Sequence, residues 1–180
     1  MADVKILAPF ILKWEGGFVN HPNDPGGATN KGVTIAVWKS QGYDKDGDGD
    51  IDVADLKLIT PADATKILKS NYWNRWFADQ IENQAVANTL VDWVWGSGAW
   101  GIKIPQRLLG IKEDGIVGYV TVNALNKAIK EDKIGFITKL YKARYDYINS
   151  IIRSNSKLAV FKTGWLNRMK DLEKFNQKYL

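Results

Sequence analysis

The chain has 180 residues, 45% of them hydrophobic, which suffices for one sizeable core or for one core with a small appended module. Cysteine is absent and histidine occurs once, so the composition excludes disulfides, thiolate metal sites and histidine-rich zinc sites. The net charge of +5 is uneven, because residues 1–95 carry 9 basic and 13 acidic side chains whereas residues 96–180 carry 16 and 7. No apolar run approaches the roughly 18 residues that span a membrane, so we expect no membrane insertion.

Helical spacing of apolar residues dominates the chain, and local capping signals mark the helix ends. Thr34 is placed to cap the second expected helix. Thr60, followed by Pro61 and then by Asp63, predicts a capped helix start of the same kind. Thr121 is placed to cap a later one. In chain order we expect helices over residues 3–15, 35–42, 54–59, 61–72, 86–96, 102–109, 121–130, 132–152 and from about 163 onward.

The period-two alternation of strands is almost absent, so the predicted class is all-α with at most a small β excursion near residues 19–35. Gly96-Ser97-Gly98 follows an expected helix, and the charge balance changes there. We therefore predict a first region over residues 1–95 and a second helical region over residues 96–180. The second region either stands apart or packs as one lobe with the first.

Glu15 ends the first expected helix, with Trp14 and Phe18 as its aromatic neighbours. Apolar surroundings and the negative end of a helix both disfavour a carboxylate, and so favour the protonated form that a general acid needs. The alternative is an ordinary exposed glutamate at a helix end. Asp24 follows in a Pro/Gly loop, as a turn residue or as the second carboxylate of a glycosidase. Thr29 is placed to help hold a water.

Residues 15–34 read Glu-Gly-Gly-Phe-Val-Asn-His-Pro-x-Asp-Pro-Gly-Gly-Ala-Thr-x-x-Gly-Val-Thr, which resembles the opening motif of glycoside hydrolase family 108, the lysozyme-like muramidases of phages and bacteria. The resemblance implies a lysozyme-like fold and an N-acetylmuramidase acting on bacterial peptidoglycan. It implies that Glu15 is the general acid, that Asp24 and Thr29 handle the water, and that catalysis needs no cofactor. A lytic transglycosylase, which needs only the glutamate, remains an alternative. So does a non-enzymatic, calcium-stabilised module for wall binding or secretion.

From Asp92 onward the chain resembles the family's predicted peptidoglycan-binding region, through Gly-Ser-Gly, Pro-Gln-Arg-Leu-Leu-Gly, Asp-Gly-x-x-Gly-x-x-Thr and a last motif that ends at Arg168. This implies wall binding, with the alternative that these helices only complete the lysozyme-like lobe. The excess of basic residues suits an anionic wall, with the alternative that it is only a solvated, lysine-rich helix surface. Nucleic acid is not expected, because no motif that reads it is present. Tyr72 and Trp73 match the family's aromatic pair, and we expect one of them to face the sugar groove unless both are core.

Residues 44–55 fit the twelve-residue EF-hand calcium loop, with acids at positions 1, 3, 5, 9 and 12 and glycine at position 6. Oxygen ligands at alternate positions can wrap one hard cation. We predict a structural Ca²⁺ whose ligands are Asp44, Asp46, Asp48, Asp55 and the backbone carbonyl of Asp50. Aspartate in place of the usual glutamate at position 12 weakens calcium binding or admits magnesium. The alternative is a solvated loop without an ion.

The first residues lack the charged start, apolar run and cleavage site of a signal peptide. We therefore expect synthesis in the cytoplasm and release to the wall through a holin, as for a prophage endolysin, or by a non-classical route. We expect a monomer.

Overall fold

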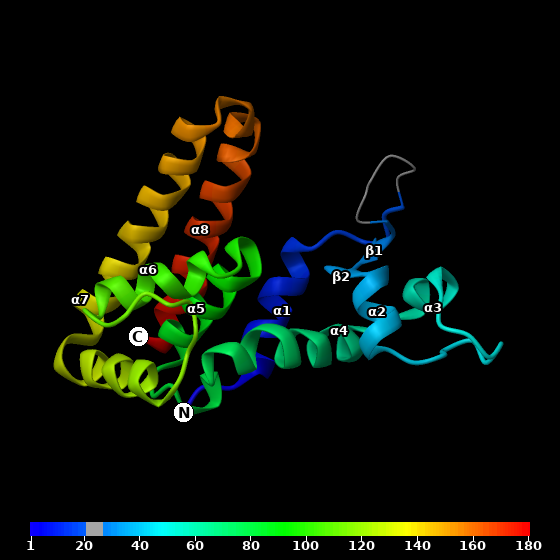
Figure 1. Cartoon of the computed structure of the whole chain (residues 1–180), viewed down its shortest axis with the longest axis horizontal. Helices are drawn as coiled ribbons and strands as arrows, with labels where there is room; N and C mark the ends of the chain where they lie inside the picture. Colours follow the sequence, from blue (N-terminus) through cyan, green and yellow to red (C-terminus); the bar gives the residue numbers. More distant parts are fainter. Residues whose placement is uncertain (21–26) are drawn as a thin grey trace. The chain divides into compact units, whose positions relative to one another are not determined.

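The computed structural model describes residues 1–20 and 27–180 (Figure 1). These residues form helices and one small two-stranded sheet, which confirms the predicted mainly helical class with a β excursion before residue 35. None of the helices in these two ranges is both long and apolar enough to cross a membrane.

The described chain divides into two compact units. The N-terminal unit is Val4–Asn71, and the C-terminal unit is Tyr72–Leu180 together with Met1–Asp3. The boundary between these units, between residues 71 and 72, differs from the boundary expected between residues 95 and 96. The expected boundary, which stays a prediction about sequence regions, lies inside helix α5 (Gln84–Ser97).

The N-terminal unit combines short helices with a hairpin (Figure 1). Its elements are α1 (Val4–Trp14), β1 (Thr29–Asn30), β2 (Val33–Thr34), α2 (Ile35–Gln41), α3 (Val53–Leu58) and α4 (Pro61–Leu68). Between the strands, Lys31 and Gly32 both have positive φ angles, 50° and 76°, as a two-residue type I′ hairpin turn requires. Helix α4 packs against α1, and Leu12 of α1 packs against the core. The buried core residues of this unit are Ala28, Val33, Trp38, Leu56, Ile59, Ala64 and Ile67.

Two of the predicted helix caps are confirmed. The Thr34 hydroxyl accepts a hydrogen bond from the Val37 amide at 3.3 Å. Thr60 and Asp63 form a reciprocal capping box, with Pro61 in the first turn of α4. These caps depend on residues at most three positions apart, which is why the sequence predicts them well.

A π-helix, Lys69–Trp73, carries the chain from one unit to the other. The longer helices of the C-terminal unit are α5 (Gln84–Ser97), α6 (Trp100–Leu108), α7 (Tyr119–Ser154) and α8 (Lys162–Asn176). Short 3-10 turns occupy Asn74–Trp76, Ala78–Gln80, Ser156–Phe161 and Gln177–Tyr179. Helix α5 is buried from Ala85 to Val94, and α6, α7 and α8 each contact it. The second half of α7 and α8 run side by side (Figure 1).

Helices α5 and α6 approach each other closely at Gly101. A Cβ atom there would lie 2.5 Å from the Val94 amide nitrogen and 2.7 Å from the Trp93 carbonyl carbon, both of them backbone atoms. Pro105 lies inside α6 and cannot donate to the carbonyl four residues earlier, which is that of Gly101. The segment is nevertheless helical, as predicted.

The start of α7 corrects one prediction. Thr121 is not a cap, because it lies within the helix and is buried, and Gly118 occupies the N-cap position without a side-chain hydrogen bond. The break expected between residues 130 and 132 is present, since Asp132 has non-helical φ and ψ angles of −156° and 81°. Its carboxylate accepts a hydrogen bond from the Gly135 amide at 2.8 Å and so caps the stretch that follows.

Candidate active site

Glu15 directly follows α1 and continues its hydrogen-bond pattern, because its amide donates to the Ile11 carbonyl at 3.1 Å. It is half-buried, as is Trp14. Phe18 lies outside α1, which ends at Trp14, and its side chain is 37% exposed. The Lys57 ammonium lies 5.1 Å from the centre of the Phe18 ring. Of the two expected aromatic neighbours of Glu15, only Trp14 thus belongs to α1.

The chain returns towards the end of α1 through backbone pairing. Val19 and Thr29 form an antiparallel bridge, in which each amide donates to the other carbonyl at 2.8 Å. Val19 lies four positions after Glu15, so their Cα atoms are at most about 14 Å apart even when this link is fully extended. The bridge therefore limits how far Thr29 can lie from Glu15. Asp24 lies outside the described residues.

Asn30 is a buried polar residue that the sequence did not single out. It is 2% exposed, and its side-chain amide donates to the carbonyls of Leu56 at 2.8 Å and Lys57 at 3.3 Å. The side chain thus ties the hairpin that carries Thr29 to the end of α3. In the sequence, the only sign of this role is the position of Asn30 next to Thr29. Its hydrogen-bond partners lie 26 and 27 residues further along the chain, so no local pattern connects them.

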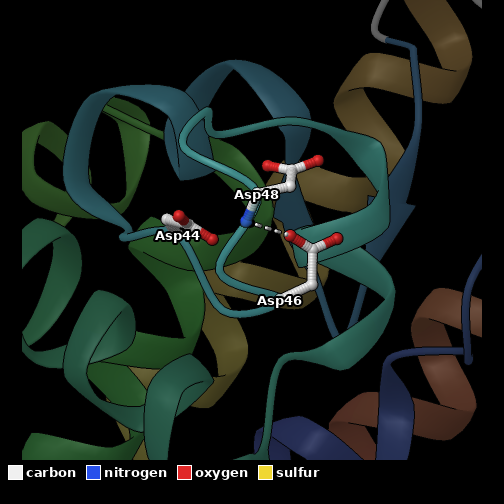
Figure 2. Close-up of side chains that lie close together, drawn as sticks. All are labelled: Asp44, Asp46 and Asp48. Atoms are coloured by element: carbon white, nitrogen blue, oxygen red, sulfur yellow. Dashed lines mark hydrogen bonds between the residues drawn. The ribbon is translucent and has the colours of Figure 1, made fainter.

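Residues 44–49 form a tight turn stabilised by carboxylates. The two oxygens of Asp44 accept from the amides of Gly47 at 2.6 Å and Gly49 at 2.9 Å. Figure 2 shows the side chains of Asp44, Asp46 and Asp48 together on this turn, with the Asp48 amide donating to Asp46. One oxygen of each of these three residues lies within 4.8 Å of the others. Gly49, at position 6, has a φ of 98°, in the region of positive φ that favours glycine.

Asp55 closes the acidic loop from its far end. Its buried carboxylate accepts from the amides of Lys45 at 2.5 Å and Asp52 at 2.8 Å. These backbone hydrogen bonds, from Asp52 first and then from Lys45, lower the pKa of Asp55. Its oxygens group with those of Asp50 and Asp52 within 4.8 Å. The structure thus places the predicted ligands in two neighbouring clusters of the loop rather than in one set of side chains.

The carboxylates of the loop repel one another. The negative charge of Asp48 is the main cause of a raised pKa at Asp50. Loss of water contact, followed by the charge of Asp48, raises the pKa of Asp46. Lys45, the one basic residue between positions 44 and 55, points its ammonium at Asp63 of α4, 2.7 Å away.

The contact between Lys45 and Asp63 fastens the loop to α4. Asp63 is 5% exposed and also accepts from the Tyr43 hydroxyl at 3.1 Å. Burial raises the pKa of Asp63, but the hydrogen bonds from Lys45, Thr60 and Tyr43 outweigh it and hold the pKa well below its ordinary value. Because α4 packs on α1, the loop connects to the helix that precedes Glu15. Through α3 and Asn30 it also connects to Thr29.

The expected aromatic pair divides into a core residue and a partly accessible one. Trp73 is fully buried and its indole nitrogen donates to Asp79 at 2.8 Å, so Trp73 is a core residue and the expectation that one of the pair faces a sugar groove rests on Tyr72. Trp73 is the buried residue of the π-helical turn Lys69–Trp73. Tyr72 is half-buried, and its ring lies 4.6 Å from that of Trp95 at a tilt of 52°. A sugar-binding role for Tyr72 stays a prediction.

Comparison with known proteins adds family information to this geometry. Residues 8–98 match the family described as Glycosyl hydrolase 108, and residues 100–170 match the one described as Predicted Peptidoglycan domain. No curated protein matches the chain. Among solved structures it is similar to the one described as "Structure of Brucella abortus SagA", with 29% identity, a TM-score of 0.73, and coverage of 98% of this chain and 94% of that chain. The first family match includes Glu15, Asp24, Thr29 and the acidic loop.

Proposed function

Because this chain belongs to the glycosyl hydrolase 108 family, we propose that it is an N-acetylmuramidase with Glu15 as its general acid. The chain is a glycoside hydrolase that acts on peptidoglycan. The finer proposal is cleavage of the β-1,4 bond between N-acetylmuramic acid and N-acetylglucosamine. The observation that supports it best is the position of Glu15 at the end of α1, with Thr29 held opposite Val19.

The proposed reaction begins when Glu15 donates its proton to the glycosidic oxygen. The bond from that oxygen to the sugar carbon breaks, and positive charge develops on the sugar ring. Asp24 stabilises this charge or accepts a proton from the attacking water, and the Thr29 hydroxyl holds that water. The water oxygen bonds to the sugar carbon, and the water's proton passes to Asp24 or, if Asp24 only stabilises the charge, to the Glu15 carboxylate. Both sugar ends then carry a free hydroxyl.

The nature of the new sugar ends tests this function. Purified peptidoglycan is digested with the protein, and the soluble fragments are reduced and weighed by mass spectrometry. We expect new reducing ends on N-acetylmuramic acid, each carrying one added water. Anhydro ends would instead identify a lytic transglycosylase, and reducing N-acetylglucosamine ends would identify cleavage of the other glycosidic bond. Either result would overturn the muramidase proposal.

We further propose that the acidic loop holds a structural Ca²⁺. The side chains of Asp44, Asp46, Asp48 and Asp55 and the backbone carbonyl of Asp50 would be its ligands, in the order that an EF-hand loop uses. An ionised carboxylate has about four lone-pair positions, so the amide hydrogen bonds within the loop leave acceptor capacity for an ion. Such an ion would brace α3 and α4, and through them the hairpin and α1.

Removal of metal should destabilise the N-terminal unit. A ligand present at about 100 times its dissociation constant stabilises the folded state by about 2.7 kcal/mol. For a chain of this size we therefore expect calcium to raise the melting temperature of chelator-treated protein by about 5–10 °C. Asp44→Ala should abolish this shift, whereas Glu131→Gln, an exposed carboxyl in the other unit, should retain it. Calorimetry that detects no calcium binding, together with an unchanged melting temperature, would contradict the proposal. Parallel titration with Mg²⁺ tests the effect of aspartate at position 12.

A further inference from the structure

A groove of 610 Å³ lies between α6 and α7 of the C-terminal unit. The residues that matter here are Trp100, Ile104, Arg107, Asp146, Tyr147 and Arg153, all of which line it. We propose that this groove is a second peptidoglycan-binding site, away from Glu15 in the sequence. A sugar ring would lie against Trp100, and a stem-peptide carboxylate would pair with Arg153. The proposal rests on peptidoglycan being the substrate of this chain.

The apolar part of the groove suits a sugar ring. Trp100 is 47% exposed, which leaves much of a large flat side chain accessible at the surface. The Tyr147 ring supports it from α7, with its centre 6.3 Å away and a tilt of 35°. Ile104 lies one helical turn after Trp100 and is 9% exposed, so it continues the apolar surface at the base of the groove. Aromatic rings held in this way present a rigid face at a low entropic cost of binding.

The polar part of the groove suits an anion. Arg153 is exposed near the end of α7, where an anion can reach it. Arg107 already forms a bidentate ion pair with Glu113, at 2.8 and 2.7 Å, so the anion would pair with Arg153. The one carboxylate among the lining residues, Asp146, is paired with Lys142 at 2.6 Å. Residues 96–180 carry 16 basic and 7 acidic side chains, so the surrounding field also attracts negative charge.

Both features together favour a peptidoglycan strand as the occupant. Its stem peptides carry carboxylates, and its sugars present apolar faces, whereas a nucleic acid would depend mainly on the arginines for its phosphates. All the lining residues lie within the segment that matches the Predicted Peptidoglycan domain. A second binding site on the same chain raises the effective concentration of enzyme at an insoluble wall, because the chain stays close when the active site releases its product.

The test measures binding of the full chain to purified, insoluble peptidoglycan by co-sedimentation, in a Glu15→Gln background that prevents digestion. Trp100→Ala should weaken binding at least about tenfold, as truncation of a central tryptophan does at other binding sites. Arg153→Glu should also weaken it, and should reduce its dependence on salt. The matched controls are Tyr119→Ala, an aromatic that is 82% exposed, and Lys170→Glu on α8. Both controls should bind like the parent.

Unchanged binding of the Trp100→Ala and Arg153→Glu variants would overturn the proposal. If Trp100→Ala lowers the melting temperature, the exposed Arg153→Glu variant decides. Duplex DNA can be added as a competitor for binding to peptidoglycan. If it displaces the parent and the Trp100→Ala variant equally well, the surface binds polyanions in general, and a glycan site would also be rejected. The wild-type digest separates this proposal from the proposed function. If the digest yields N-acetylmuramic acid ends and the Trp100→Ala variant still binds normally, only the groove proposal is rejected. If Trp100→Ala weakens binding but the digest yields no new sugar ends, only the muramidase proposal is rejected.

Discussion

Replacement of Glu15 with glutamine should lower the rate of peptidoglycan hydrolysis by about 10²- to 10⁴-fold. Glutamine keeps the shape of the side chain but cannot donate a proton to the glycosidic oxygen, so the sugar would leave as an unprotonated alkoxide. Binding to insoluble peptidoglycan should persist, since the substitution removes a proton rather than a contact surface. The release of reducing sugar ends from purified wall, measured under single-turnover conditions, reports the chemical step.

A matched substitution separates this effect from a general loss of a carboxylate. Glu131→Gln makes the same chemical change at an exposed position on α7, and its hydrolysis rate should equal that of the wild type. Both variants should melt like the parent, because neither position is fully buried. Undiminished hydrolysis by Glu15→Gln would remove Glu15 from the catalytic role and leave the family assignment intact.

The second large effect concerns a charge cluster buried in the C-terminal unit. Asp92 is fully buried on α5 and forms ion pairs with Arg144 of α7 at 2.8 Å and Arg168 of α8 at 2.7 Å. The contact with Arg144 lacks the angle of a hydrogen bond, whereas Arg168 also donates from its Nε atom at 3.1 Å. Burial raises the pKa of Asp92, but the two arginines outweigh it and hold this pKa below its ordinary value. Burial lowers the pKa of Arg144 despite the neighbouring carboxylate.

Asp92→Asn should therefore reduce the free energy of unfolding by about 3–5 kcal/mol, because it leaves buried arginine charges without a counter-charge. Chemical denaturation followed by tryptophan fluorescence measures the change. The control is Asp146→Asn on α7, which removes a carboxylate that pairs with Lys142 at the surface and should cost at most about 1 kcal/mol. Equal stability of the two variants would show that the buried cluster contributes no more than a surface pair.

Acid should remove the stabilisation that the ionised Asp92 carboxylate contributes. The folded pKa of Asp92 lies below its unfolded value, which is about 3.9 for an ordinary aspartate, so its contribution is complete above that pH. The contribution declines as the pH falls from about 4 towards the folded pKa. The stability difference between the wild type and Asp92→Asn should thus be constant near neutrality and shrink below about pH 4. A difference that grows on acidification would contradict the assigned direction of the pKa shift.

Asp92 and Arg168 illustrate what sequence patterns convey and what they omit. Both stand in motifs that resemble the family's pattern, yet nothing in those motifs shows that the two side chains meet. Their contact joins residues 76 positions apart, and it forms only because α5 and α8 pack together. Trp73 shows the same limit, since its position in an aromatic pair did not reveal that it is fully buried.

Local signals determined the helices, the caps at Thr34 and Thr60, the break at Asp132 and the glycine conformation at position 49, because each depends on residues within one turn. The tertiary structure alone decided which residues connect these elements. Asn30 reaches the end of α3, and Lys45 reaches Asp63 on α4, so that the acidic loop is tied to the segments that carry Thr29 and Glu15. Such contacts depend on how separate elements pack, and no spacing along the chain encodes that packing directly.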